Sequence, residues 1–151
     1  MIAPDVNVLL YACREDADRH AEYRSWLQAA LNGSERVALF EPVLAATVRI
    51  GTHPAIYRPP TPRRAIEAFI DACLAAPAAV RLRPETGHWA LFKNACTRAD
   101  CRGNLVQDAY LAAAAIEHDC VFMTTDRDFS RFAGLRWRHP LDELHVTENP
   151  R

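Results

Sequence analysis

The chain opens with the stretch MIAPDVNVLLYAC, which covers residues 1–13. Residues 1–5 have the short, mainly apolar character of a buried strand, and this strand ends on Asp5. Residues 6–13 continue as an apolar segment, for which Asn7 is a possible helix cap. A carboxylate at the end of a strand is typical of the edge where open α/β sheets place their functional sites. This junction therefore predicts an α/β fold with a site beside its first strand.

The rest of the chain alternates between strand-like and helix-like segments. Further strands are expected over residues 36–40, 79–82, 120–123 and 135–137. Helices are expected over residues 17–31, 42–50, 61–76, 86–99 and 105–118, with a short helix from Asp126 and a proline-rich loop over 51–62. This alternation favours parallel strand pairing with right-handed crossovers. We expect a single domain over residues 1–141, followed by a polar C-terminal tail over 142–151.

Composition narrows the class of protein. No apolar run reaches the length of about 18 residues that suggests a membrane span, and no basic segment precedes an apolar one as in a secretion signal. The five cysteines include no Cys-x-x-Cys pair, which favours free thiols in a reducing compartment. The spacing of Cys96 and Cys101 is poor for a zinc site. We therefore expect a cytoplasmic protein without a membrane partner.

The charged residues give a mixed indication about nucleic acid. The net charge of −1 does not indicate a nucleic-acid binder. Lys93 is the only lysine among 18 basic residues. This bias fits the better geometry of arginine for phosphate, and it fits a GC-rich genome equally well.

Four acidic residues stand where an α/β chain would gather them. Asp5, Glu41 and Asp126 follow predicted strands, and Asp108 opens an apolar helical segment. Converging carboxylates repel one another unless a cation joins them, and Mg²⁺ or Mn²⁺ held by oxygen ligands is the usual solution. Asp128 is either a further ligand beside Asp126 or an ordinary acid in the first turn of a helix. The pattern predicts a metal-dependent enzyme that acts on phosphate esters.

Several sequence segments together resemble one family of nucleases. They are DVNVLLYA (5–12), VRIGTHP (48–54), GNLVQDAYLA (103–112) and TTDRDF (124–129), the last followed by GLRW (134–137) and PL (140–141). In this order, from residue 1 to about 141, they resemble the motifs of PIN-domain ribonucleases. The later segments are similar to those of the VapC-type toxin branch of type II toxin–antitoxin systems.

The resemblance implies a three-layer α/β/α sandwich with a four- or five-stranded, mainly parallel sheet. It also implies a homodimer, Mg²⁺- or Mn²⁺-dependent endoribonuclease activity, and a cognate VapB-type antitoxin that occludes the site. Asp5, Asp108 and Asp126 match acidic positions of the family directly. The family's second acid falls near Ala46, whereas Glu41 stands about a turn and a half earlier in the chain. Val6 replaces the usual hydroxyl residue after the first aspartate, so one hydrogen bond near the metal is expected to be missing.

Each of several smaller polar side chains has two possible roles. Thr124 or Thr125 could orient a carboxylate or be ordinary strand residues, and Asn7 could bind phosphate or only cap a helix. The arginines that could contact RNA phosphates, or simply remain solvated, are Arg49, Arg127 and Arg131. The apolar faces of residues 17–31 and 43–50 are expected to form the groove that receives the antitoxin.

Other functions fit the sequence less well. A PIN-like module that has lost its metal and only binds a partner is the main alternative, supported by Val6 and the displaced Glu41. A receiver-type phosphoacceptor needs a lysine after its last core strand, and Lys93 is not placed there. A phosphatase of the haloacid-dehalogenase type would have an aspartate at the position of Asn7.

Overall fold

A five-stranded parallel sheet forms the centre of the molecule in the computed structural model, which describes residues 1–142. The strands are β1 (Ile2–Pro4), β2 (Val37–Phe40), β3 (Ala79–Leu82), β4 (Val121–Met123) and β5 (Arg136–Arg138). Their order across the sheet is β3-β2-β1-β4-β5, and every neighbouring pair is parallel. The predicted α/β class and parallel sheet are confirmed. The predicted tail over 142–151 lies, apart from Asp142, outside the described residues.

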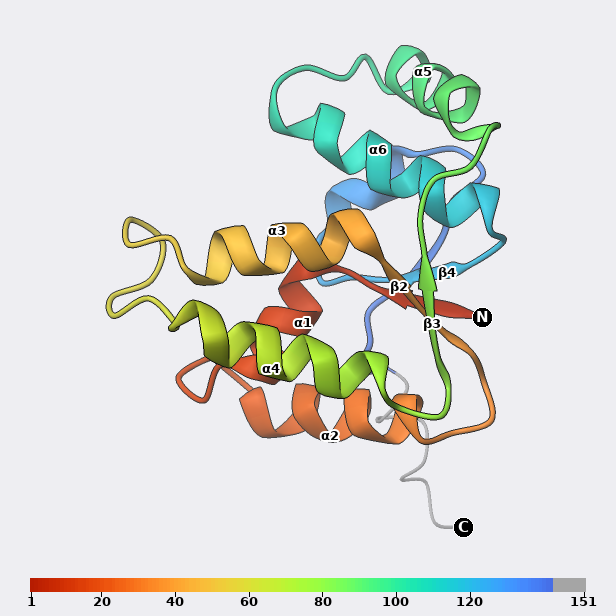
Figure 1. The fold of residues 1–151 in the computed structure, drawn as a ribbon. Helices are drawn as coiled ribbons and strands as arrows, with labels where there is room; N and C mark the ends of the chain where they lie inside the picture. Colours follow the sequence, from red (N-terminus) through yellow and green to blue (C-terminus); the bar gives the residue numbers. More distant parts are fainter. Residues whose placement is uncertain (143–151) are drawn as a thin grey trace, which may run out of the picture.

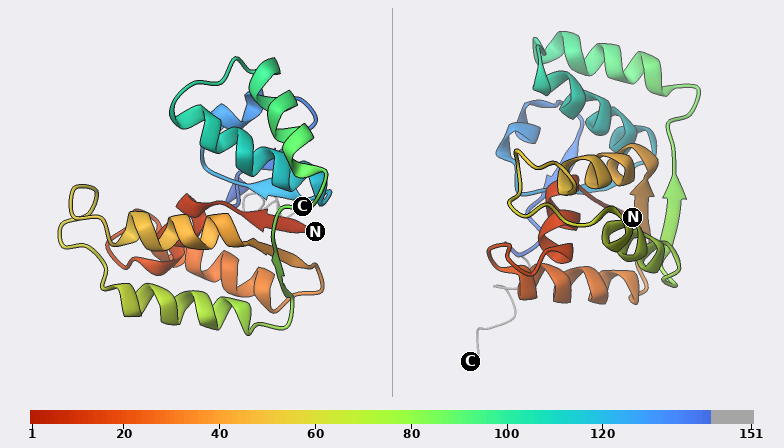
Figure 2. Two further views of the ribbon diagram at one scale, coloured as in Figure 1. Left: turned by 45° about the horizontal axis from the view of Figure 1, so that its top comes forward. Right: turned by 60° about the vertical axis from the view of Figure 1, so that its left-hand side comes forward.

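Helices cover both faces of this sheet (Figures 1 and 2). The helices are α1 (Val6–Cys13), α2 (His20–Leu31), α3 (Glu41–Gly51), α4 (Arg63–Leu74), α5 (His88–Arg98) and α6 (Asn104–Glu117), with a short 3-10 helix, η1 (Arg127–Arg131), before β5. The helices α1 to α4 lie on one side of the sheet, and α5 and α6 lie on the other. This arrangement is the predicted three-layer sandwich.

Burial explains why the strands read as continuous apolar runs. All four residues of β2 are buried, because helices cover a parallel sheet on both faces. In α6, the stretch from Ala112 to Ala115 is fully buried, so this helix packs through small side chains on all sides. Phe40 and Phe122 are among the largest side chains with no exposed surface, and they fill the core next to the sheet.

The chain reverses its direction of travel across the sheet at β1. The path from β1 to β2 and β3 moves toward one edge, and β4 and β5 are then added on the other side of β1. In open α/β sheets, functional sites form at such a reversal, beyond the carboxyl ends of the two central strands. The ends of β1 and β4 therefore mark the site, and these are the strands that Asp5 and Asp126 follow.

Within residues 1–142, no helix is long and apolar enough to cross a membrane.

Candidate active site

Asp5 lies at the junction of β1 and α1, and its side chain is almost completely buried, with 5% of the residue exposed. One carboxylate oxygen accepts a hydrogen bond of 2.7 Å from the backbone N–H of Val6 and so caps α1. The other accepts a hydrogen bond of 2.6 Å from the hydroxyl of Thr124. Burial raises the pKa of Asp5, the hydrogen bonds from Thr124 and Val6 oppose that rise, and nearby Asp126 adds to it.

Thr124 connects the two central strand ends. It directly follows β4, is fully buried, and donates its hydroxyl proton to Asp5. The same oxygen lies 3.3 Å from the side-chain nitrogen of Asn7 and 3.1 Å from the backbone nitrogen of Asp126, and both groups donate to it. A hydroxyl offers one donor and two acceptor positions, so Thr124 uses all of them. Of the two threonines that the sequence indicated, Thr124 joins this network.

Asp108 approaches the same place from the opposite layer of the fold. It lies in the second turn of α6 and is half-buried. Its pKa is raised to about 6, first by burial and then by the negative charges of Asp126, Asp5 and Asp128. Asp108 lines the same pocket as Asp5 and Asp126.

Asp126 and Asp128 take different roles at the start of η1. Asp126 caps this helix by accepting a hydrogen bond of 2.8 Å from the backbone N–H of Asp128. Asp128 is exposed, and its carboxylate lies 3.3 Å from Nε of Arg131. The structure therefore gives Asp128 the position of a first-turn acid paired with Arg131.

One pocket of about 480 Å³ contains most of the candidate site residues. Its acidic end is lined by Asp5, Asp108 and Asp126. Asn7, Asn104 and Gln107 add amide groups, and Arg49 adds a guanidinium group. The remaining lining is mostly apolar or aromatic and consists of Val6, Leu10, Tyr11, Ala46, Ile50, Ile56, Tyr57, Leu111 and Phe129.

The donor atoms in this pocket suit a hard cation. Three carboxylates face one hollow, and Oδ1 of Asn7 is a buried acceptor with no hydrogen-bond partner in the structure. A hydrated Mg²⁺ ion carries waters that donate hydrogen bonds to such acceptors, and it needs only one or two carboxylates for direct contact. Within residues 1–142, no three histidine, cysteine, aspartate or glutamate side chains are close enough to form a direct ligand set. The pocket therefore fits a cation that keeps much of its hydration shell.

The structure does not bring Glu41 to this pocket, which corrects its assignment as a metal ligand. Glu41 is the first residue of α3 and is about half exposed, and its carboxylate lies 3.5 Å from Nε of Arg81. It is absent from the pocket lining, whereas Ala46 is present. An α-helix turns by about 100° per residue, so positions 41 and 46 face directions about 140° apart. The α3 side chains that share the pocket face are Ala46, Arg49 and Ile50.

Two further amides were missed in the sequence, although a signal for them was present. Asn104, Gln107 and Asp108 all line the pocket, and their i, i+3 and i+4 spacing places them on one face of α6. Tyr57 also lines the pocket from the proline-rich loop between α3 and α4. No periodicity marks a loop residue of this kind, so only the structure could identify it.

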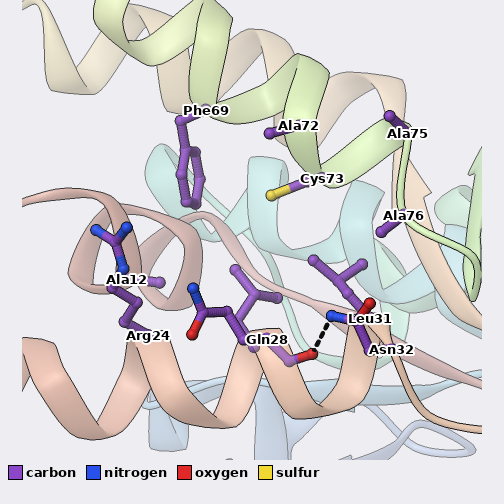
Figure 3. Close-up of a pocket in the computed structure, with 11 residues that line it drawn as sticks. Ala12, Arg24, Gln28, Leu31, Asn32, Phe69, Ala72, Cys73, Ala75 and Ala76 are labelled. Atoms are coloured by element: carbon purple, nitrogen blue, oxygen red, sulfur yellow. Dashed lines mark hydrogen bonds between the residues drawn. The ribbon is translucent and has the colours of Figure 1, made fainter.

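A second pocket, of about 350 Å³, lies between helices on the α1 to α4 face (Figure 3). Phe69, Ala72 and Cys73 of α4 face Arg24 and Gln28 of α2 across it, and Ala12 of α1 lies between the two helices beside Arg24. The side-chain nitrogen of Asn32 donates a hydrogen bond of 2.8 Å to the backbone carbonyl of Gln28 and closes one end of the α2 wall. The sequence placed the groove between α2 and α3. In this pocket α4 forms the second wall, and the groove expected between residues 17–31 and 43–50 stays a prediction.

Comparison with known proteins agrees with this fold. Residues 2–135 match the PIN domain family. The chain is 46% identical over 142 residues to Ribonuclease VapC43 from Mycobacterium tuberculosis, covering 94% of this chain and 97% of that protein. It is 39% identical over 136 residues to Ribonuclease VapC37 from the same organism, covering 90% of this chain and 94% of that protein.

Solved structures share the same arrangement of elements at lower sequence identity. The structure of VapBC2 from Rickettsia felis, bound to a DNA fragment from its promoter, superposes with a TM-score of 0.68 at 17% identity, covering 92% of this chain and 98% of that chain. The FitAcB structure from Neisseria gonorrhoeae superposes with a TM-score of 0.66 at 19% identity, covering 93% and 98%. With the family match over most of the chain and relatives this similar, the chain belongs to the PIN-domain family and, within it, to the VapC ribonucleases.

Proposed function

We propose that this protein is a divalent-metal-dependent endoribonuclease and the toxin of a toxin–antitoxin pair. The observation that carries the proposal is the convergence of Asp5, Asp108 and Asp126 on one pocket from three separate elements of the fold. Family membership supports ribonuclease activity, because the similar curated proteins are named ribonucleases.

The three aspartates would hold Mg²⁺ or Mn²⁺ at the acidic end of the pocket. When bound, the ion supplies charge neutralisation at the phosphate oxygens and a lower pKa for the attacking water. Thr124 donates a hydrogen bond to Asp5 and accepts one from the backbone of Asp126, which orients two of the acids. Arg49 lies exposed at the pocket and can bind a phosphate of the RNA chain.

The raised pKa of Asp108 supports a cation at this place. In the protein alone, burial and three neighbouring acids disfavour its charged form. A divalent ion reverses that balance, because attraction to the cation stabilises the carboxylate and desolvation then costs less. A cluster of this kind is unfavourable for stability by itself, which is the usual mark of a functional site.

The proposed partner is a VapB-type antitoxin. Similar solved structures contain toxin and antitoxin together, as their VapBC names state. The pocket between α2 and α4 is a mainly apolar groove that can receive the apolar face of a helix. The homodimer and the cytoplasmic location implied by the sequence stay predictions.

The decisive test is RNA cleavage by the Asp108→Asn variant. Purified wild type should cleave single-stranded RNA in Mn²⁺ and lose activity in EDTA, and Asp108→Asn should be inactive at every Mn²⁺ concentration. Calorimetric titration should show weaker Mn²⁺ binding by the variant. Asp100→Asn is the matched control, because Asp100 is an exposed acid outside the pocket. Full cleavage by Asp108→Asn would overturn the proposal.

A partner-binding module without activity is the second candidate, favoured by one observation. The α3 position that faces the pocket is Ala46, so α3 contributes no carboxylate there. If wild type neither cleaves RNA nor binds Mn²⁺ more tightly than Asp108→Asn does, this second reading is correct. Cleavage that depends on Mn²⁺ excludes it.

A further inference from the structure

The part of the active pocket away from the aspartates has a chemistry that phosphodiester hydrolysis does not require. It is lined by Tyr11, Tyr57 and Ile56 together with aliphatic side chains of α1 and α3. Ile56 is 52% exposed, which makes it one of the large apolar side chains that remain in contact with solvent. Exposed apolar surface beside a polar site marks a place where a ligand covers it.

The ring of Tyr57 is held in place by a buried arginine. The guanidinium carbon of Arg14 lies 3.8 Å from the centroid of the Tyr57 ring, in a cation–π contact. Arg14 is only 8% exposed, although it carries a full charge. It lies just beyond the end of α1 and does not line the active pocket itself. Arg14 therefore supports the ring without occupying the pocket.

The hydrogen bonds of Arg14 fix the loop that carries Tyr57. Its Nη1 donates a bond of 2.5 Å to the hydroxyl of Thr61, and its Nη2 contacts Asp16 at 2.6 Å and the carbonyl of Pro59 at 3.4 Å. Nε of Arg14 is buried without a hydrogen-bond partner. A buried arginine with one unsatisfied nitrogen is costly, and the hydrogen bonds of its other nitrogens hold the loop beside Tyr57. The loop also closes on itself, with the backbone nitrogen of Tyr57 bonded to the carbonyl of His53 at 3.0 Å.

The amides of α6 complete the arrangement. Asn104 and Gln107 line the same pocket from exposed positions, and each side chain offers both donors and acceptors. Aromatic rings that stack on bases, combined with polar groups that reach base edges, are the means by which proteins hold unpaired RNA bases. A protein segment would pack against the apolar wall of the pocket, but it would have less use for the hydrogen bonds that these amides offer beside Arg49.

We propose that Tyr57, held by Arg14, is the stacking surface for an unpaired nucleobase next to the phosphate that is cleaved. Asn104 and Gln107 then contact the polar edge of that base, and Ile56 packs against the side of the base that would otherwise face solvent. The inference rests on the proposed ribonuclease function and adds to it a subsite for one base. It makes Tyr57 a base-binding residue and Arg14 a positioning residue.

Binding without cleavage tests the subsite independently of the reaction. The Asp108→Asn protein is titrated in Mg²⁺ with fluorescein-labelled decamers of uridylate, adenylate and cytidylate, and with a decamer of abasic ribose phosphates, by fluorescence anisotropy. Tyr57→Ala in the same background should weaken binding of at least one base-bearing decamer about tenfold. It should leave binding of the abasic decamer unchanged. Tyr57→Phe in the same background keeps the ring, so it should bind every decamer with the affinity of the Asp108→Asn protein.

Control variants separate this subsite from general effects on RNA binding. Trp89→Ala removes another exposed aromatic side chain, one that does not line the pocket, and should change none of the affinities. Arg14→Lys keeps the charge but loses the planar fork, so it should weaken binding only of the base-bearing decamers. If Tyr57→Ala does not fold, Tyr57→Leu in the same titrations provides the comparison.

The outcomes distinguish this inference from the proposed function. Equal affinity of the parent for abasic and base-bearing decamers would overturn the base subsite and leave the pocket wall to a protein segment. Equal binding by Tyr57→Ala and the parent would also overturn it. A wild type that does not cleave RNA would refute the proposed function, yet the loss of base-dependent affinity in Tyr57→Ala could still be measured.

Discussion

At the scale of single residues, Thr124 organises the site more than any of the acids does. Its hydroxyl donates to Asp5 and accepts from Asn7 and from the backbone of Asp126, so one oxygen joins β1 and β4 beyond their ends. This arrangement also shows how Asp5 is hydrogen-bonded although the residue after it is Val6, which has no hydroxyl group. Asp5 receives its side-chain hydrogen bond from Thr124, across the sheet, and a second bond from the backbone of Val6.

Replacing Thr124 by valine should therefore destabilise the fold. Valine has nearly the same shape but removes the hydrogen bond to one oxygen of the buried Asp5 carboxylate and the acceptor of the Asp126 N–H. We expect a loss of roughly 1–3 kcal/mol in the free energy of unfolding, measured by urea denaturation. Thr125→Val changes a neighbouring threonine that is only partly buried and should have a smaller effect. Equal midpoints for the two variants would contradict the role given to Thr124.

Neutralising Asp108 should stabilise the metal-free protein in a pH-dependent way. The folded state raises the pKa of Asp108 from 3.8 to about 6, so folding binds its proton more tightly than the unfolded chain does. The charged carboxylate therefore costs stability as pH rises from about 4 through about 6, and this cost is fully present above that range. Asp108→Asn should raise the melting temperature in EDTA at pH 7.5. The gain should shrink at pH 5, and an equal gain at both pH values would contradict the shifted pKa.

At the scale of elements, the direction in which a helix faces decides which acids can act. The helix α3 begins immediately after β2, but its first residue, Glu41, faces Arg81 on the neighbouring strand β3. The pocket face of α3 is formed by Ala46, Arg49 and Ile50, one turn and more along the helix. An acid after a strand therefore belongs to the site only if the following helix presents it there.

Glu41→Gln should accordingly leave Mn²⁺ binding unchanged. Its contact with Arg81 is an exposed pair, which contributes at most about 1 kcal/mol to stability. Calorimetric Mn²⁺ titration should give the affinity of the wild type for Glu41→Gln and a weaker one for Asp108→Asn. A similar fall in both variants would show that Glu41 reaches the ion after all.

At the scale of the whole molecule, the acidic pocket and the apolar groove lie on different parts of one small fold. The three aspartates form a concentrated negative charge inside a protein whose net charge is only −1. The groove between α2 and α4 is mainly apolar and lies on the α1 to α4 face. An antitoxin segment that fills the groove and extends an arginine or lysine into the pocket would gain charge-assisted hydrogen bonds from the aspartates.

Such a segment and Mn²⁺ should compete, because both neutralise the same carboxylates. By linkage, the apparent affinity of a peptide from the C-terminal part of the antitoxin should fall as Mn²⁺ rises. Fluorescence anisotropy at several Mn²⁺ concentrations measures this dependence. Phe69→Ala in the groove should weaken binding of the peptide without changing how that binding depends on Mn²⁺. A peptide affinity independent of metal would place the inhibitory contact away from the aspartates.

The sequence by itself determined the fold class, and it predicted the three acids that line the pocket. Strand-like runs that end on Asp5 and Asp126 predict the carboxyl edge of a parallel sheet. This prediction is possible from the sequence because a local pattern of polarity depends only on neighbouring residues in the chain. Asp108 was found because a carboxylate inside an apolar helix needs a partner or a function. The fifth predicted strand is present as well, one residue later, at Arg136–Arg138.

Only the tertiary structure decided which side chains meet. Glu41 has the right residue type and follows a strand, yet the rotation of α3 directs it to Arg81. Tyr57 lies in a loop without periodicity and reaches the pocket because Arg14, 43 positions earlier, holds its ring. The hydroxyl of Thr124 bonds to Asp5 across 119 positions of the chain. These contacts depend on packing between distant segments, and local sequence carries no record of the angle or distance at which such segments meet.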